Sequence, residues 1–133
     1  MTFSPAAVDS ITAHFKDRKI DENYYDLVVT GDLGTVGHSI TSEQLEISGL
    51  SLGDRYIDCG MEIYDIEKQD THAGGSGCGC CASVFTGYIY KLLKSAKINR
   101  VLLTATGALM STTSSFQGAS IPGIAHCVAI ERV

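Results

Sequence analysis

The stretch HAGGSGCGCCASVF, residues 72–85, concentrates side chains and backbone types that can do chemistry. It holds the three cysteines Cys78, Cys80 and Cys81, with His72 before them and four glycines among residues 74–79. Thiols can ligate metals or act as nucleophiles, and glycines let the backbone approach a ligand or a neighbouring segment closely. The stretch therefore raises three hypotheses: a metal site, a reactive thiol, or a glycine turn.

The cysteine spacing does not favour a metal site. A structural zinc site usually combines a C-x2-4-C pair with a second ligand pair further along the chain. The candidates for a second pair are His72, Cys59, His126 and Cys127, and none of them has ligand spacing. Cys81 also falls on the apolar face of the helix that follows. We therefore predict no metal ligand and no cofactor.

A reactive thiol remains open for Cys78 and Cys80. Both lie where a helix begins, and the helix dipole favours a thiolate there. A nucleophile also needs a base. His72 is close in sequence, and His126 lies in a predicted strand. For Cys81 we favour the role of a small hydrophobic side chain in a packed interior.

The glycines predict a turn that leads into the N-terminus of a helix. Gly74, Gly75, Gly77 and Gly79 can adopt positive φ angles, and the turn would expose amide donors suited to a carboxylate or a phosphate. Tight packing of the helix against a sheet explains the same glycines equally well.

Hydrophobic patterns place this stretch in a layered α/β fold. Apolar periodicity predicts helices over residues 5–16 and 80–97, and short apolar runs predict strands over residues 24–32, 100–107 and 123–133. A short helix is expected at residues 42–48, and residues 55–67 read as extended or irregular. In the helix at 80–97, one apolar face is predicted to contain Cys81, Val84, Phe85, Tyr88, Leu92 and Ala96.

Three predicted strands are few, because sheets usually have about four to six. One sheet edge and one sheet face would remain unfinished, so we expect the chain to be incomplete as an isolated unit. The last two strands are joined by about fifteen residues rich in Ser, Thr and Gly. Loops of that length are uncommon in compact domains and tend to be functional.

Composition narrows the class of partner. The net charge of −5 disfavours nucleic acid, and no apolar run is long enough to span a membrane. Five cysteines without a secreted spacing pattern indicate reduced thiols. Residues 71–130 contain no Asp or Glu and four cations, so this region would tolerate an anion. The same cations also fit the solvated face and end of one helix: Lys91, Lys94, Lys97 and Arg100.

Three segments resemble a known family. DLVVTGDLGTVG (residues 26–37), DTHAGGSGCGCCASVFTGYI (residues 70–89) and VLLTATGALMSTTSSFQGASIPGIAHCVAIERV (residues 101–133) resemble the C-terminal part of the stage V sporulation protein AD family. The resemblance implies an α/β, thiolase-like fold with a mixed sheet. It also implies that residues 1–133 form a single C-terminal half-domain, and that an N-terminal thiolase-like half is missing.

The resemblance further implies that thiolase chemistry is lost. His72 stands where thiolases carry Asn, and Cys80-Cys81-Ala82 falls where they carry a catalytic Gly-His-Pro. The loop before the final strand has no cysteine near Ala119, where thiolases carry a catalytic thiol. Without these proton-transferring groups, acyl condensation lacks its machinery, so no catalytic residue is predicted.

The function implied by the resemblance is binding of dipicolinic acid, as the acid or its calcium chelate, for uptake into the developing spore. Implied partners are the SpoVA membrane proteins of the spore, the missing N-terminal half and a second copy in a homodimer. The expected location is the cytoplasm or the periphery of the spore inner membrane. The candidate ligand-binding residues are His72, Gly75, Gly77, Cys78, Cys80, Ser111 and Thr112.

Two rival functions stay open. One is a thiolase-class acyltransferase with altered residues, which would use Cys78 or Cys80 together with His72 or His126. The other is a thiol redox or metal module formed by the CGCC sequence at residues 78–81.

Overall fold

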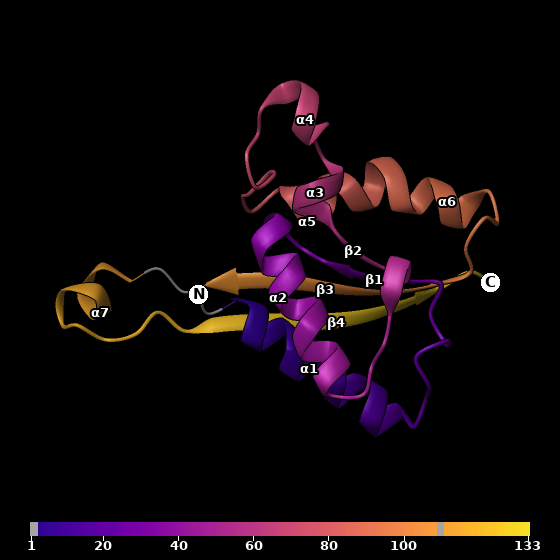
Figure 1. The fold of residues 1–133 in the computed structure, drawn as a ribbon, viewed down its shortest axis with the longest axis horizontal. Coiled ribbons are helices and arrows are strands. Elements are labelled where there is room, and N and C mark those ends of the chain that lie inside the picture. Colours follow the sequence, from indigo (N-terminus) through magenta and orange to yellow (C-terminus); the bar gives the residue numbers. More distant parts are fainter. Residues whose placement is uncertain (1–2, 109–110) are drawn as a thin grey trace.

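A mixed four-stranded sheet forms the centre of the chain in a computed structural model that describes residues 3–108 and 111–133 (Figure 1). The strands are β1 (Leu27–Thr30), β2 (Tyr56–Asp58), β3 (Arg100–Ala108) and β4 (Gly123–Glu131). Their order is β2-β1-β3-β4, with β1 parallel to β2 and β3, and β4 antiparallel to β3. The predicted α/β class with a mixed sheet is confirmed.

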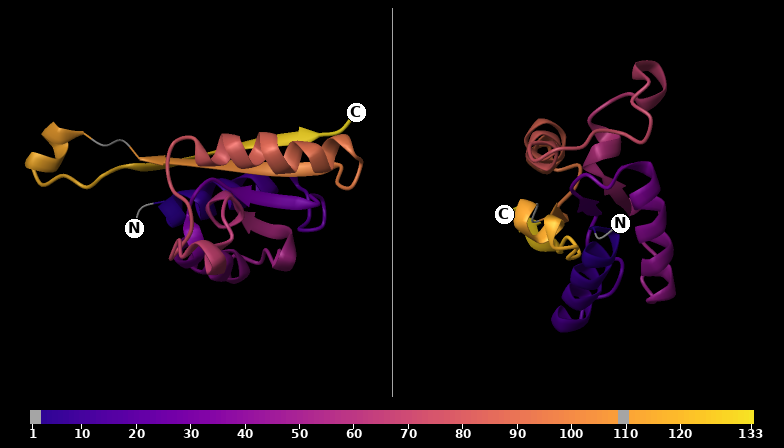
Figure 2. Two further views of the ribbon diagram at one scale, coloured as in Figure 1. Left: turned by 90° about the horizontal axis from the view of Figure 1, so that it is seen from above. Right: turned by 90° about the vertical axis from the view of Figure 1, so that its left-hand side faces the viewer.

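Helices cover both faces of the sheet (Figure 2). One face is covered by α1 (Phe3–Arg18) and α2 (Gly34–Ile47). The other is covered by a continuous helix composed of α5 (Cys80–Val84), the π-helical segment η2 (Phe85–Ile89) and α6 (Tyr90–Lys94). Successive strand residues point to opposite faces, so Val28 packs with Ile11 under α1 while Val29 packs with Ile89 under the long helix.

The remaining elements are short. A 3-10 turn, η1 (Gly53–Arg55), leads into β2, and β2 is followed by α3 (Cys59–Glu62) and α4 (Ile66–Gln69). The last helix, α7 (Thr112–Phe116), lies at the tip of the arm that extends from β3 and β4 (Figures 1 and 2).

Two local predictions were only partly correct. The helix expected at residues 42–48 is present and ends at Ile47, but it begins earlier, at Gly34, whose amide is held by the distant side chain of Asp58. Residues 55–67, expected to be extended or irregular, contain the extended strand β2 but also α3 and part of α4. A strand of three residues is too short to show alternation, so its pairing with β1 had no local signal.

The predicted apolar face of the long helix was correct at its start and wrong further on. Val84, Ile89 and Leu93 are buried, whereas Tyr88 is 46% exposed and Ala96 is also exposed. The π-helical segment adds one residue to a turn, so the step from Val84 to the next buried position is five residues instead of four.

The sheet has an open edge at β4. Ile124 and Val128 are 52% and 53% exposed, although both are large apolar side chains in this strand. The helices therefore leave part of one face uncovered at β4, as expected for an unfinished sheet.

Candidate functional site

The glycine-rich loop (residues 73–79) lies at the edge where the parallel strands β1, β2 and β3 end. Its contacts establish this position: the amide of Thr35 donates to Ala73 O at 2.8 Å, and the amide of Gly75 donates to Gly60 O at 2.6 Å. Thr35 lies in the first turn of α2 and Gly60 in that of α3. Open α/β sheets bind ligands beyond the carboxyl ends of their strands, so this edge is the candidate site.

A buried carboxylate organises this edge. Asp58 is fully buried at the end of β2. Its Oδ1 accepts hydrogen bonds from Thr30 Oγ1 at 2.6 Å and from the amide of Leu33 at 2.9 Å. Its Oδ2 accepts from the amides of Gly34 at 2.9 Å and Gly60 at 3.0 Å. One side chain thereby joins β1, the start of α2 and the start of α3.

A second carboxylate ties down the glycine-rich loop. Asp32, half-buried after β1, accepts hydrogen bonds at Oδ2 from the amide of Gly77 at 3.1 Å and from Ser76 Oγ at 3.4 Å. Its Oδ1 accepts from Thr106 Oγ1 of β3 at 2.9 Å. The loop is therefore fixed to two strands through side-chain acceptors that lie far away in sequence.

The first glycines of the loop serve close packing. Gly74 has a φ of +112° and lies against the carbonyl of Gly60. Gly75 is buried, and a Cβ there would lie 2.5 Å from Cγ2 of Ile63. For these two positions, tight packing against neighbouring chain is the explanation that the contacts support.

The last glycines of the loop face open space. Gly77 has a φ of +141°, and a Cβ at Gly77 or Gly79 would meet no atom within 4 Å. Cys78 between them is exposed. The amides of Cys78 and Gly79 form no hydrogen bond with any other described residue. Residues 77–79 are thus the part of the loop that a ligand can approach.

His72 and His126 do not contact the cysteines of residues 78–81 through any hydrogen bond among the described residues. The His72 side chain is 88% exposed, and its Nδ1 lies 3.8 Å from Oδ1 of Asp70. His126 is exposed on β4. Neither histidine is positioned in this chain as a base for Cys78 or Cys80.

The predicted hydroxyl ligands lie apart from the glycine-rich loop. Thr112 begins α7, at the tip of the β3–β4 arm, and both views place this helix away from the loop (Figures 1 and 2). Ser111 directly precedes α7 and is half-buried. Residues 109–110, which connect β3 to Ser111, lie outside the described residues, as do the side chains of residues 114 and 115.

Cys59 is a site residue that the sequence reasoning missed. It is fully buried at the start of α3, in the apolar cluster against which Cys81 of α5 packs. Hydrogen bonding with the Cys59 thiol lowers the pKa of Cys81, and hydrogen bonding with Cys81, followed by burial, raises the pKa of Cys59. Burial, followed by the charges of Asp32 and Asp58, raises the pKa of Cys80.

No group of three or more His, Cys, Asp or Glu side chains in the described ranges is arranged to hold a metal ion. Residues 72–81 line none of the cavities whose lining is described.

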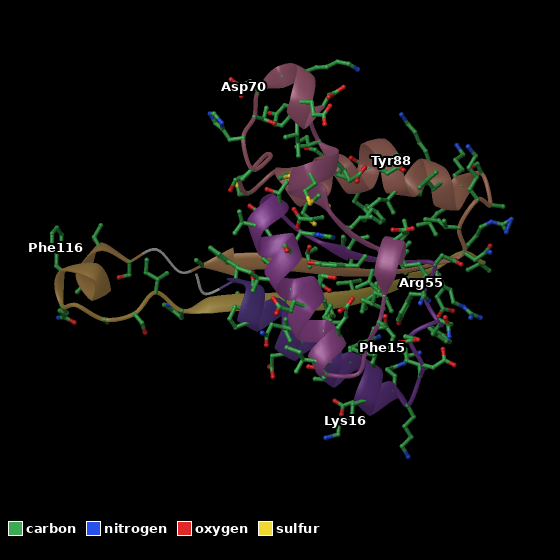
Figure 3. All side chains as sticks on the ribbon, in the orientation of Figure 1. Phe15, Lys16, Arg55, Asp70, Tyr88 and Phe116 are labelled. Carbon is green, nitrogen blue, oxygen red and sulfur yellow. The ribbon has the colours of Figure 1, made fainter. Side chains whose placement is uncertain are left out.

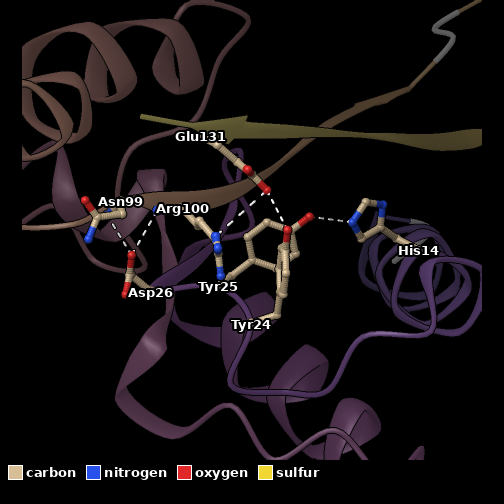
Figure 4. Close-up of polar contacts among 7 residues, drawn as sticks. All are labelled: His14, Tyr24, Tyr25, Asp26, Asn99, Arg100 and Glu131. Carbon is tan, nitrogen blue, oxygen red and sulfur yellow. Dashed lines mark hydrogen bonds and ion pairs between the residues drawn. The ribbon is translucent and has the colours of Figure 1, made fainter. Parts of the chain in front are cut away.

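One of these cavities, of about 450 Å³, lies at the opposite edge of the sheet. There the Asp26 carboxylate accepts from the amides of Asn99 at 2.7 Å and Arg100 at 2.9 Å, and Tyr24 donates to Glu131 at 2.8 Å (Figure 4). The Arg100 guanidinium stacks 4.4 Å over the ring of Tyr24. These groups bind one another and join β1 to β3 and β4, so we assign them a structural role.

The long helix presents its cations to solvent. Lys91, Lys94 and Lys97 are exposed, as is Arg100 beyond its end. Figure 3 shows side chains that project outward from this helix and from the arm that carries Phe116. The three lysines therefore form a solvated face, which was one of the two explanations left open by the sequence, whereas Arg100 stacks on Tyr24.

Comparison with known proteins identifies the family to which this chain belongs. A family model for stage V sporulation protein AD matches residues 1–131. The chain belongs to this family. A curated relative, stage V sporulation protein AD of Bacillus subtilis (strain 168), is 46% identical over 129 residues. The match covers 97% of this chain but 38% of the relative, so the chain spans well under half of the relative's length. The family prediction is confirmed, and the stage V sporulation protein AD family is one of sporulation proteins.

Replacing Gly75 by Ala is expected to destabilise the fold by about 1–3 kcal/mol, because the new methyl group would overlap Ile63. Gly79→Ala is the matched control, since its methyl group would point into open space. Urea unfolding followed by circular dichroism measures both variants. Equal stability of the two would contradict the packing role of Gly75.

The hydrogen bond from Cys59 predicts that Cys81 ionises at lower pH than Cys127, whose pKa is raised by burial. Because the thiolate is the nucleophile, alkylation of Cys81 should approach its own maximal rate at lower pH than alkylation of Cys127. Peptide mass spectrometry after timed iodoacetamide treatment from pH 6 to 10 measures both profiles. Alkylation of Cys127 that reaches its maximal rate at lower pH than that of Cys81 would contradict hydrogen bonding from Cys59 to Cys81.

Proposed function

We propose that this chain is the C-terminal half of a thiolase-like sporulation protein that binds dipicolinic acid and takes part in its uptake into the developing spore. The observation that carries the proposal is the open end of the glycine-rich loop, residues 77–79. Two amides without a described partner, those of Cys78 and Gly79, lie there at the start of the long helix. Amides at a helix start suit a carboxylate ligand.

Hydrogen bonds hold the loop in one conformation before any ligand binds. Asp32 accepts a hydrogen bond from the amide of Gly77, and Gly60 accepts one from the amide of Gly75. Little chain entropy would therefore be lost when an anion binds at residues 77–79. His72 is exposed in the same connection between α4 and α5 and can reach toward an acid. A small planar diacid matches such a set of donors.

Asp32 favours the calcium chelate of dipicolinate over the bare dianion. Asp32 is half-buried, and its carboxylate accepts a hydrogen bond from the amide of Gly77 at 3.1 Å. A ligand carboxylate bound beside Gly77 would be repelled by this negative charge. Calcium takes carboxylate oxygens as ligands, so a chelated calcium ion would turn this repulsion into attraction.

Binding is better supported than acyl transfer. Cys80 is buried and its pKa is raised, which disfavours its thiolate. Neither His72 nor His126 hydrogen-bonds a described thiol that it could activate. Steady acyl-CoA turnover by the complete protein that is abolished when Cys78 is alkylated would instead support the acyltransferase.

The remainder of a longer protein would complete the pocket. A chain that matches 38% of the length of its relative would supply only part of such a pocket. The exposed residues Ile124 and Val128 of β4 offer an apolar surface to an N-terminal half or to a second copy.

The proposal also includes contact with the SpoVA membrane proteins, and a location in the cytoplasm or at the spore inner membrane. Across residues 3–108 and 111–133, no helix has both the length and the apolar character to cross a membrane.

Calorimetry on the complete protein tests the proposal. Calcium dipicolinate should bind more tightly than dipicolinate titrated in the presence of a calcium chelator. His72→Ala should weaken binding by about tenfold, the loss expected for one charge-assisted hydrogen bond. His126→Ala is the control, since His126 is similarly exposed but lies on β4. Absence of binding to the unmodified protein, or equal losses in both variants, would contradict the assignment.

A further inference from the structure

A groove separates α1 from α2 on the face of the sheet that these two helices cover (Figure 1). The helices touch near their N-terminal ends, where Ser4 Oγ donates a hydrogen bond to Gly37 O at 3.3 Å. Further along, they leave a cavity of about 440 Å³ between them. The residues that line this α1–α2 groove include Val8 and Asp9 of α1 and Ile40 of α2.

Apolar side chains form the floor and one rim of the α1–α2 groove. Val8 is partly buried against the apolar core on this side of the sheet. On α2, Ile40 is 37% exposed, Val36 is 56% exposed and Ile47 is 73% exposed. At 3.6 residues per turn, positions 36, 40 and 47 lie on one side of the helix. An exposed apolar stripe that borders a groove is typical of an interaction surface.

The charged residues beside the groove are acidic. Residues 3–15 and 34–54, which include both walls, contain four Asp or Glu residues and no Lys or Arg. Asp9 lines the groove, and Glu43 lies on the side of α2 that carries the exposed apolar stripe. Both residues are exposed, and neither carboxylate forms a hydrogen bond or an ion pair within residues 3–108 and 111–133. The groove thus presents unpaired negative charge next to apolar surface.

We propose that the α1–α2 groove binds a basic amphipathic helix of a partner protein. Apolar side chains spaced three and four residues apart on such a helix would enter the groove, and flanking Lys or Arg side chains would pair with Asp9 and Glu43. With a rise of about 1.5 Å per residue, the stripe from Val36 to Ile47 extends about 16 Å, which three turns of a partner helix would cover. The inference does not depend on the ligand proposed for the glycine-rich loop.

The charge of the groove disfavours two other occupants. A second copy bound about a twofold axis would present the same surface, so its acidic residues would lie opposite those of the first copy and repel them. An anionic lipid surface would be repelled for the same reason. A basic helix instead gains ion pairs with Asp9 and Glu43 while it covers the exposed apolar side chains.

Fluorescence anisotropy on the complete protein tests the proposal. The probe is a labelled peptide of about 14 residues that contains only Leu and Lys, with Leu at helical positions i, i+3, i+4 and i+7. It should bind, and its affinity should fall as the salt concentration rises, because ion pairs at a surface are screened. Two control peptides should bind at least about tenfold more weakly. One carries Glu in place of Lys, and the other has the same composition without the helical period.

Variants assign the binding to the groove. Ile40→Ser removes an apolar contact and Asp9→Lys reverses a charge, so each should weaken binding of the basic peptide by about tenfold. Both side chains are exposed, so the fold should be retained, which the thermal midpoint by circular dichroism verifies. Matched controls are Tyr88→Ser, at a side chain of the long helix that is 46% exposed, and Glu67→Lys, at an exposed residue of α4. Both controls should bind the peptide like the unmodified protein.

Amide hydrogen exchange locates the bound peptide. The peptide should slow exchange in α1 and α2 and leave the long helix unchanged. Absence of binding, equal binding of the acidic peptide, or an affinity that Ile40→Ser and Asp9→Lys leave unchanged would overturn the proposal. So would a dimer in sedimentation experiments that Ile40→Ser dissociates, because a second copy would then occupy the groove.

Discussion

The buried carboxylate of Asp58 is the interaction on which the rest of this structure depends. A carboxylate without solvent is costly unless donors replace its water, and here four donors do so from β1, from the start of α2 and from the start of α3. Removing the side chain would leave several buried donors without partners at once. The geometry of the whole strand edge is therefore set by one residue of the shortest strand.

The glycine-rich loop acquires its shape from that edge. Gly74 and Gly75 pack on the start of α3, while Asp32 holds Gly77 and leaves residues 77–79 open. The loop thus combines a rigid part, which has no room for side chains, with a part that a small acid can approach.

Local sequence patterns predicted those elements whose formation depends on residues that are close together in the sequence. The helix at residues 5–16, the long helix and the strands β1, β3 and β4 follow from apolar periodicity, and the glycines and cysteines marked the loop as special. The start of α2, the strand β2 and the importance of Cys59 depend on contacts of Asp58 and Gly60 with residues far away in sequence. The face of the long helix changed because a π-helical turn cannot be read from a period of 3.6 residues.

Amide hydrogen exchange tests the central claim most directly. The amides of Leu33, Gly34 and Gly60 lie outside any strand, yet the account predicts that they exchange as slowly as the amides inside β1, because the Asp58 carboxylate holds them. In Asp58→Asn, which retains the shape but has one acceptor oxygen instead of two, their exchange should accelerate by about tenfold or more. Exchange in the unmodified protein as fast as that of the Gly79 amide, or rates unchanged in the variant, would contradict the account.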